Sequence, residues 1–292
     1  MGLTPLTVGF SIMKKAPVNK IIPFSNVDGP GNRTSIFFQG CPFNCLFCHN
    51  PETIHMCQNC GVCVEKCPVG ALSVDAQGQV QWDRSRCVQC DTCIKLCPHD
   101  ASPKIRWMTV EDVMGEIRRS APYITGITTS GGECTLQNEF LIDLFTQVQA
   151  LGKTCLIDSN GSFDFEADPR VLSVSQGVML DVKAVETQWS DTLISYPRDR
   201  VLKNLDYLLS VGKLYEVRTI IFPGRDRDNE ATVRYVAEHI GDGCFYKIIR
   251  YRPYGVRERY QKILGEFETE ADYAEGFARL ARDLGASKAY VV

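Results

Sequence analysis

Short apolar runs alternate along the chain with longer stretches that carry apolar residues at helical spacing. Six short runs predict buried strands, because each is four to eight residues long and ends near turn-forming residues; they lie at residues 34–39, 126–129, 154–158, 177–181, 215–222 and 245–250. Five longer stretches predict helices, at residues 109–120, 138–151, 200–211, 229–240 and 269–284. Strands that alternate with helices favour an α/β fold with a parallel sheet.

End signals support two of these helices. Thr109 suits the N-cap of the first, whose first turn is acidic and whose last turn is basic, as the helix dipole favours. The charged residues are Glu111, Asp112, Arg118 and Arg119. Gly152 suits the C-cap of the second helix, because glycine adopts a left-handed conformation without strain.

Polar or glycine-rich segments follow several of the predicted strands. They are the loop that begins at Cys41, then Ser130-Gly131-Gly132-Glu133, Asp158-Ser159-Asn160-Gly161 and Asp181-Val182-Lys183. In parallel barrels the chemistry lies at the C-terminal ends of the strands. We therefore expect a functional site where these segments meet.

Composition narrows the class of protein. The 292 residues carry a net charge of −3, which gives no reason to expect nucleic acid or an anionic membrane as a partner. No segment is long and apolar enough to span a bilayer. The apolar run at residues 3–13 precedes Lys14 and Lys15, which is the reverse of a signal peptide. We expect a cytoplasmic protein without nucleic-acid or membrane partners.

One basic stretch departs from the overall charge balance. Residues 247–262 carry six basic residues and a single acid, Glu258. Two interpretations stay open: a solvated loop and helix face, or a patch that docks a partner or contacts an anion.

Fourteen cysteines need an explanation, and eleven of them lie between Cys41 and Cys97. In a reducing cytoplasm, clustered thiols bind metal or carry redox chemistry more often than they form disulfides. The other three, Cys134, Cys155 and Cys244, are expected to be ordinary buried thiols.

The first three cysteines of this block, Cys41, Cys45 and Cys48, have the spacing CxxxCxxC. Three thiolates on one loop can hold three irons of a 4Fe–4S cluster and leave the fourth iron open, as a catalytic metal centre requires. The alternatives are a zinc site that lacks a fourth ligand, or one that His49 completes, although ligation by adjacent Cys48 and His49 is awkward.

The rest of the block is an internal repeat, in which four cysteines recur 30 residues later and a proline follows each set. The spacing CxxCxxCxxxCP is that of bacterial ferredoxins, where the fourth cysteine of each run ligates the other cluster. It predicts one 4Fe–4S cluster on Cys57, Cys60, Cys63 and Cys97, and another on Cys87, Cys90, Cys93 and Cys67. A pair of zinc sites, each with four cysteine ligands, is the alternative, but zinc ligands usually come as separated pairs.

The segment around Cys41 resembles a known family. CxxxCxxC with Phe47 before the third cysteine is similar to the signature of the radical S-adenosylmethionine (SAM) superfamily. The flanking sequence resembles the opening of the glycyl-radical-enzyme activating enzymes, the group that includes pyruvate formate-lyase activase. The matching residues are Asn26-Val-Asp-Gly-Pro-Gly31, Arg33, Phe37-Phe-Gln-Gly-Cys41 and Cys48-His-Asn50. Residues 20–51 most resemble the YjjW-type activases.

The resemblance implies a fold and a domain arrangement. The fold would be a partial (β/α)6 barrel similar to a TIM barrel, formed by residues 1–53 and 105–292. Residues 54–104 would be an inserted ferredoxin-type domain, as in many of these activating enzymes. The protein would then carry three 4Fe–4S clusters.

The resemblance also implies a SAM site. Ser130-Gly131-Gly132-Glu133 resembles the segment that meets the methionine amino group. Asp158-Ser159 and Asp181-Val182-Lys183 resemble segments that contact the nucleoside and a monovalent cation beside the methionine carboxylate. Arg218 resembles a strand arginine near the sulfonium, and Phe47, Cys48 and His49 complete the cofactor-binding set. One further contact, from Arg252 or Tyr254, is left unassigned.

The implied activity is reductive cleavage of SAM to methionine and a 5′-deoxyadenosyl radical, which takes a hydrogen atom from a glycine of a partner enzyme. The partner would be a glycyl radical enzyme, and the electron donor a flavodoxin or ferredoxin-type protein. Two alternatives stay open. A radical SAM enzyme for a small molecule would need a closed polar pocket, and an electron-transfer ferredoxin fused to an inert domain would not cleave SAM.

Overall fold

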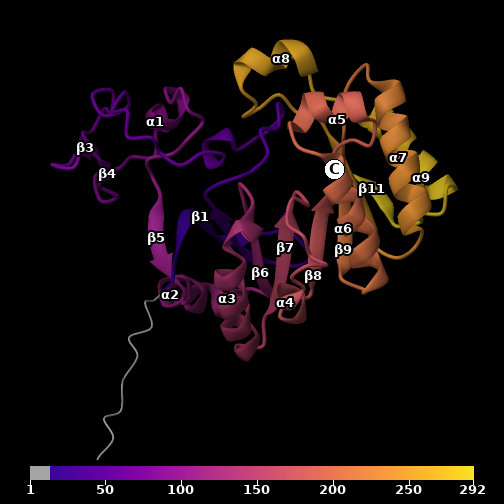
Figure 1. Ribbon diagram of the computed structural model, residues 1–292, viewed down its shortest axis with the longest axis horizontal. Coiled ribbons are helices and arrows are strands. Elements are labelled where there is room, and N and C mark those ends of the chain that lie inside the picture. The colour runs from indigo at the N-terminus through magenta and orange to yellow at the C-terminus, as the bar shows by residue number, and fades with distance from the viewer. Residues whose placement is uncertain (1–13) are drawn as a thin grey trace, which may run out of the picture.

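The computed structural model describes residues 14–292, and its centre is a nine-stranded sheet (Figure 1). The strand order is β11-β10-β9-β8-β7-β6-β2-β1-β5. The strands are β1 (Lys15–Ser25), β2 (Arg33–Phe38), β5 (Arg106–Thr109), β6 (Gly126–Gly131), β7 (Thr154–Ser159), β8 (Gly177–Asp181), β9 (Leu214–Ile221), β10 (Phe245–Arg250) and β11 (Ala289–Val291). The apolar run at residues 3–13 lies outside the described residues.

Most of this sheet is parallel. Every neighbouring pair from β2 to β11 is parallel, whereas β1 is antiparallel to both β2 and β5. The predicted α/β fold is confirmed: the six predicted strands correspond to β2, β6, β7, β8, β9 and β10, with ends within two residues. Their C-terminal ends therefore meet along one edge of the sheet.

Five helices pack against the sheet, and all five were predicted. They are α2 (Val110–Ser120), α3 (Asn138–Ala150), α6 (Arg198–Ser210), α7 (Asp226–Ile240) and α9 (Ala271–Asp283). Thr109 caps α2 through a reciprocal pair of hydrogen bonds with Asp112. Gly152 lies one residue beyond the C-cap of α3 with φ of 70°, and its N–H donates to the Gln149 carbonyl at 2.8 Å.

Other elements were not predicted. Outside residues 54–104, the unpredicted strands and α-helices are β1, β5, β11 and the short helices α4 (Arg170–Ser173), α5 (Thr187–Ile194) and α8 (Glu258–Leu264). β1 includes Pro17 and Pro23 and several polar residues, so its sequence lacks a regular strand pattern. It is a strand because both of its edges pair with neighbours. No helix within residues 14–292 is long and apolar enough to cross a membrane.

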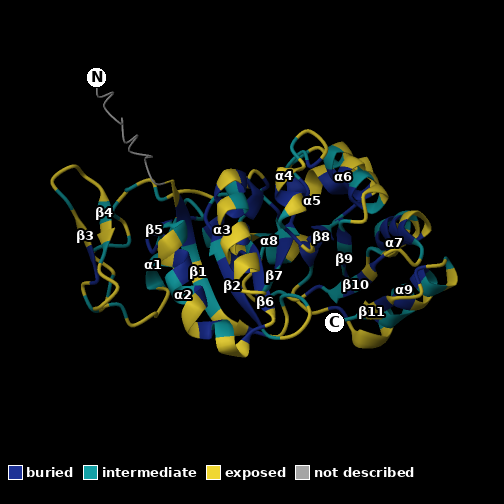
Figure 2. Ribbon diagram, turned by 90° about the horizontal axis from the view of Figure 1, so that it is seen from below, coloured by how far each residue is buried: buried dark blue, intermediate teal, exposed yellow. Residues whose placement is uncertain are grey.

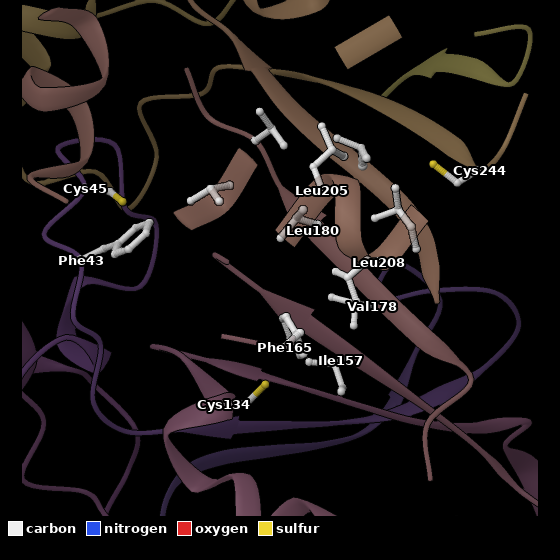
Figure 3. Packing of buried hydrophobic residues seen from close by; sticks show 14 of the residues in the cluster. Phe43, Cys45, Cys134, Ile157, Phe165, Val178, Leu180, Leu205, Leu208 and Cys244 are labelled. Atoms are coloured by element: carbon white, nitrogen blue, oxygen red, sulfur yellow. The ribbon is translucent and has the colours of Figure 1, made fainter. Parts of the chain in front are cut away.

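The apolar core joins the sheet to its helices. Val178 and Leu180 of β8 lie toward Leu205 and Leu208 of α6 (Figure 3), and all four side chains are fully buried. The same core cluster includes Phe43 and Cys45, from the loop that follows β2. The three cysteines predicted to be ordinary thiols are all buried, as expected; they are Cys134, Cys155 and Cys244.

Residues 54–104 contain the repeated cysteines and little regular structure. They form the hairpin of β3 (Leu72–Val74) and β4 (Val80–Trp82) and the short helix α1 (Thr92–Lys95). This part is largely exposed and lies beside the β5 end of the sheet (Figure 2). A parallel bridge between His55 and Ala101 joins the two ends of the segment.

Candidate active site

The cysteine loop, residues 40–50, follows β2 at the C-terminal edge of the parallel strands. Four of its backbone N–H groups donate to carbonyls outside it, two in the chain that follows and two at the end of α5. The pairs are Gly40–Thr53 at 2.8 Å, Cys41–Ile54 at 2.9 Å, Asn44–Ile194 at 3.2 Å and Leu46–Leu193 at 2.9 Å. The loop is therefore held by the fold on two sides.

Burial dominates the chemistry of the three thiols in this loop. Cys45 is buried, while Cys41 and Cys48 are half-buried. Burial raises the pKa of all three thiols, and Lys183 partly opposes the rise for Cys45. Coordination by a metal deprotonates such thiols outright. The loop thus suits a bound, positively charged metal centre better than free thiolates.

Phe47 and His49, both predicted to bind cofactor, take different positions. Phe47 is buried and packs edge-to-face against Phe222, with 5.4 Å between the two ring centres. The Lys183 ammonium lies 5.3 Å from the centre of the Phe47 ring. His49 is exposed, and its Nε2 lies 2.9 Å from the Arg252 carbonyl oxygen. Phe47 therefore anchors the loop from inside, and His49 joins it to the chain after β10.

Arg252 and Tyr254, between which one SAM contact was left unassigned, have different surroundings after β10. Tyr254 is 76% exposed. The Arg252 guanidinium lies 3.7 Å from the Glu268 carboxylate. Arg252 contacts the cysteine loop through its carbonyl rather than its side chain.

Gly131 and Gly132 bring the end of β6 against the cysteine loop. The Gly132 N–H donates to the Phe38 carbonyl at 3.0 Å, and the Glu133 N–H to the Gly40 carbonyl at 2.8 Å. A Cβ at Gly132 would lie 2.2 Å from the Gly40 oxygen, and one at Gly131, where φ is 120°, would lie 2.3 Å from the Phe38 backbone. Both positions therefore require glycine for the approach of the protein's own backbone.

The Glu133 carboxylate is buried and hydrogen-bonded within the protein. It accepts from the Thr135 N–H at 3.1 Å and hydroxyl at 2.6 Å, from the Ser159 hydroxyl at 3.1 Å, and from the Asn160 N–H at 2.7 Å. Burial raises the pKa of Glu133, and these hydrogen bonds oppose the rise. Glu133 thus ties the end of β6 to the end of β7.

Asp158 and Arg218 form a largely buried ion pair between β7 and β9, with side chains 17% and 11% exposed. The Arg218 guanidinium donates to Asp158 Oδ1 at 2.9 Å and to Glu216 Oε1 at 2.7 Å, while the Ser130 hydroxyl donates to Asp158 Oδ2 at 2.9 Å. Burial raises the pKa of Asp158 and Arg218 opposes that rise. Burial alone would lower the pKa of Arg218, but Asp158 and Glu216 raise it above its usual range.

Asp181 and Lys183 extend this network to β8. The Lys183 ammonium donates to Asp181 Oδ2 at 2.6 Å. Burial alone would lower the pKa of Lys183, but Asp181 and Cys45 raise it above its usual range. Between them, Val182 is buried and its N–H donates to the Arg218 carbonyl at 2.9 Å. The predicted SAM residues on β6 to β9 therefore adjoin one another, and Lys183 joins them to the cysteine loop.

Cysteines of both repeats come together in residues 54–104. Four of them line one cavity of about 20 Å³: Cys67 from the first repeat and Cys87, Cys90 and Cys93 from the second. Burial raises the pKa of Cys63 to about 11, and the nearby thiols Cys93, Cys57 and Cys97 add to the rise. Within residues 14–292, no three His, Cys, Asp or Glu side chains are close enough to hold a single metal ion.

The Asp-Gly-Pro-Gly loop, residues 26–32, borders a large cavity. Arg33 is 1% exposed and pins this loop to β6, donating to the Thr128 hydroxyl at 2.8 Å and the Ile127 carbonyl at 2.5 Å. A cavity of about 820 Å³ separates the loop from β9, β10 and β11. Its lining includes Val27, Gly29, Pro30, Glu216, Lys247 and Tyr290.

Two residues of this site were missed from the sequence. The Glu216 carboxylate also lies 3.3 Å from the Lys247 ammonium and accepts from the Tyr290 hydroxyl at 2.8 Å. The sequence could have pointed to Glu216, because Glu216 and Arg218 are charged residues at alternate positions of a mostly apolar strand. Alternate positions of a strand lie on the same face. Gln39 is 1% exposed, and its amide donates to the Glu52 and His55 carbonyls in the chain after the cysteine loop. It stood in the matching segment Phe37-Phe-Gln-Gly-Cys41 but was given no role there.

Comparisons with known proteins agree with this geometry. The radical SAM superfamily model matches residues 35–236. The indoleacetate decarboxylase activating enzyme of Tractidigestivibacter scatoligenes is 30% identical over 82% of this chain and 83% of its own length. The benzylsuccinate synthase activating enzyme of Thauera aromatica is 29% identical over 78% of this chain and 75% of its own.

A solved structure shares the fold at low identity. The radical SAM methyltransferase from Sphaerobacter thermophilus superposes with a TM-score of 0.54 and 14% identity, over 96% of this chain and 77% of that one. Its likeness concerns the fold alone. With the cysteine loop, the polar strand ends and the curated relatives, the family is clear. The chain belongs to the radical SAM superfamily and, within it, to the glycyl-radical-enzyme activating enzymes.

Proposed function

We propose that this enzyme cleaves SAM at the cysteine loop and uses the resulting radical to remove a hydrogen atom from a glycine of a partner glycyl radical enzyme. The observation that carries the proposal is the contact between the loop and the polar network. Asn160 donates to the Cys41 Sγ and to the Glu133 carboxylate. The Lys183 ammonium, which pairs with Asp181, lies 5.3 Å from the centre of the Phe47 ring. A radical SAM centre needs such a combination of metal ligands and polar groups for an amino-acid cofactor.

The residues suit the parts of the cofactor. Cys41, Cys45 and Cys48 would hold a 4Fe–4S cluster, which supplies the electron for cleavage and an open iron for the SAM amino and carboxylate groups. Peptide groups and side chains around it would bind the rest of SAM or hold the groups that bind it. These are Phe47, His49, Gly131, Gly132, Glu133, Asp158, Ser159, Asp181, Val182, Lys183 and Arg218. Because Glu133 is saturated by protein donors, its part is to hold Asn160 and Ser159 in place.

A monovalent cation beside the SAM carboxylate stays part of the proposal. The groups that would bind it are the carboxylates of Asp158 and Asp181. Arg218 already pairs with Asp158, and Lys183 with Asp181. The cation would therefore have to share each carboxylate with a basic side chain.

Residues 54–104 are proposed to be a ferredoxin-type domain with two further 4Fe–4S clusters. The four-cysteine cavity supports it, because Cys67 joins the second repeat as crossed ligation requires. These clusters would receive electrons from a flavodoxin or ferredoxin-type donor and pass them to the cysteine loop. None of the fourteen cysteines is paired in a disulfide, which suits the reducing cytoplasm.

The partner glycine would enter through the 820 Å³ cavity beside the Asp-Gly-Pro-Gly loop. Its volume also lies within the range of small-molecule sites, so what favours a protein loop as the substrate is the likeness to activating enzymes and not the size of the cavity. The polar residues Glu216, Lys247 and Tyr290 offer hydrogen bonds to a peptide backbone there.

The test is anaerobic. The protein is reconstituted with iron and sulfide, reduced with dithionite and given SAM, and 5′-deoxyadenosine is quantified for the wild type and Cys41→Ala. We expect product from the wild type only. The active protein is then mixed with a panel of purified glycyl radical enzymes, and one member is expected to show a glycyl radical by electron paramagnetic resonance. Iron-loaded protein without deoxyadenosine would favour an electron carrier, and deoxyadenosine without any glycyl radical would favour a small-molecule substrate.

A further inference from the structure

The chain after β10 packs directly on the cysteine loop. Gly255 has φ of 81°, and a Cβ there would lie 2.8 Å from the His49 carbonyl oxygen. Two residues later, the Arg257 guanidinium donates to the Cys45 carbonyl at 2.7 Å through Nη2. The loop that carries the thiols is therefore covered by a segment 212 residues away in the sequence.

Arg257 joins three parts of the molecule. Its Nη1 donates to Asn44 Oδ1 at 2.8 Å, within the cysteine loop, and to Asp100 Oδ2 at 2.7 Å, within the segment of repeated cysteines. The side chain is 6% exposed and its guanidinium lies over the Tyr260 ring at 4.5 Å. A planar guanidinium can serve several acceptors at once, whereas an ammonium offers no such fork.

Asp100 is held in an unusual backbone conformation for this contact. Its φ is 48°, in the left-handed region, which aspartate and asparagine tolerate better than most residues. Its carbonyl accepts from the His55 N–H at 3.3 Å, at the base of the segment, and it follows Cys97 by three residues. Asp100 therefore links the base of the cysteine-rich segment to Arg257.

The basic stretch at residues 247–262 gains an explanation that neither sequence interpretation offered. Five of its six basic residues pair with acids of the same chain. The pairs are Lys247–Glu216, Arg250–Glu268, Arg252–Glu268, Arg257–Asp100 and Arg259–Asp100. The stretch thus forms internal ion pairs, two of which reach the cysteine-rich segment.

We propose that Arg257 and Asp100 form a latch that holds residues 54–101 against the cysteine loop, so that order in either part depends on the other. Both side chains are largely buried, so Asp100→Asn leaves Arg257 as a buried charge without a carboxylate, and Arg257→Gln leaves Asp100 with Arg259 as its only basic partner among these residues. Arg259 contacts the same Asp100 oxygen, but its side chain is 54% exposed and water can replace it. Arg257 and Asp100 are positioning residues: they act through the cysteine loop.

The latch has a consequence that rests on the proposed function. If residues 54–101 carry two clusters, the latch fixes their distance from the cluster on Cys41, Cys45 and Cys48. Loosening it would slow electron transfer between them. SAM binding would be affected less, since most of the proposed SAM residues lie at or near the ends of β6 to β9 rather than on the cysteine loop.

The first experiment needs no catalytic activity. Amide hydrogen exchange of the fully reconstituted protein is compared for the wild type, Asp100→Asn, Arg257→Gln and the matched control Arg259→Gln. Asparagine keeps the left-handed conformation and removes only the charge. We expect Asp100→Asn and Arg257→Gln to speed exchange about tenfold in both residues 40–50 and residues 54–101, and Arg259→Gln to change it less than about twofold. Faster exchange in only one of the two parts, or an equal effect of Arg259→Gln, would overturn the latch. If Arg257→Gln does not fold, the comparison of Asp100→Asn with Arg259→Gln alone tests the latch.

The second experiment separates the latch from the proposed function. Reduction of the SAM-responsive cluster by limiting dithionite is followed by rapid freeze-quench electron paramagnetic resonance. We expect Asp100→Asn to slow it about tenfold while iron content stays equal to the wild type. If the wild type does not cleave SAM, the proposed function is refuted, but the hydrogen-exchange result still tests the latch. Normal reduction in Asp100→Asn would contradict the consequence for electron transfer.

Discussion

The side-chain amide of Asn160 donates to the Sγ of Cys41 at 3.4 Å. Asn160 is 6% exposed, and its backbone N–H donates to the buried carboxylate of Glu133. Glu133, in turn, bonds through its own N–H to Gly40, the residue before Cys41. The end of β7 therefore reaches a thiol on the loop after β2, and Glu133 fixes the direction of approach.

Removing this amide should lower the reduction potential of the cluster on the cysteine loop. An N–H donor to a ligating sulfur stabilises the more negative, reduced state more than the oxidised state. A hydrogen bond to a charged group is worth about 1.5–3 kcal/mol, of which only part differs between the two states. We expect Asn160→Ala to lower the potential by roughly 20–60 mV.

The measurement is a redox titration in which electron paramagnetic resonance follows the SAM-responsive signal. Asn160→Asp provides the graded comparison, because it removes the donor and adds a negative charge beside the sulfur. Its potential should lie below that of Asn160→Ala. Equal potentials for the wild type and both variants would show that the contact has no influence on the cluster.

Gly132 should tolerate no side chain. A Cβ there would lie 2.2 Å from the Gly40 oxygen, so Gly132→Ala would push the cysteine loop away from β6. Overpacking of this kind costs about 1–3 kcal/mol. We expect a lower Tm and a loss of about four irons, from the cluster on this loop alone.

Gly115, within α2, is the matched control. A Cβ at Gly115 would meet nothing within 4 Å, and alanine in a helix is favoured by roughly 0.5–1 kcal/mol over glycine. Gly115→Ala should therefore raise Tm and leave the iron content unchanged. A similar Tm and iron content for both variants would argue against the close approach of Gly132 to Gly40.

Local patterns in the sequence predicted the parallel strands, the long helices and the ligating motifs. Asp158 and Lys183 could be singled out because charged residues at the ends of apolar strands converge in any parallel sheet. Arg218 lies inside β9 and was singled out only by its resemblance to a family arginine. Long-range contacts were not predictable in this way. Arg257 and Cys45 are separated by 212 residues, and nothing local marks this arginine among its basic neighbours. Likewise, β1 is a strand through its two partners rather than through its own residues.

The buried pair of Asp158 and Arg218 should matter more than an exposed pair of the same kind. Their side chains are 17% and 11% exposed, and Asp158→Asn would leave Arg218 with Glu216 alone. Breaking a buried pair costs about 3–5 kcal/mol. We expect a Tm lower by several degrees and SAM binding weakened at least tenfold, measured by thermal melting and equilibrium dialysis.

The exposed pair of Arg170 and Asp168 provides the control, with side chains 57% and 28% exposed. Such pairs contribute about 0–1 kcal/mol, so Arg170→Gln should change neither Tm nor SAM binding noticeably. If Asp158→Asn behaves like Arg170→Gln in both measurements, the network on β6 to β9 has no part in SAM binding.

Crossed ligation in residues 54–104 can be tested by counting irons in pairs of variants. Cys67 and Cys90 line the same cavity although they belong to different repeats, whereas Cys63 and Cys67 belong to one repeat and to different predicted clusters. Each cluster contains about four irons. The double variant Cys67→Ala/Cys90→Ala should therefore lose about four irons, and Cys63→Ala/Cys67→Ala about eight. Cys155→Ala, at a buried thiol outside both repeats, should lose none. Uncrossed ligation would reverse the two double variants, because each repeat would then hold its own cluster.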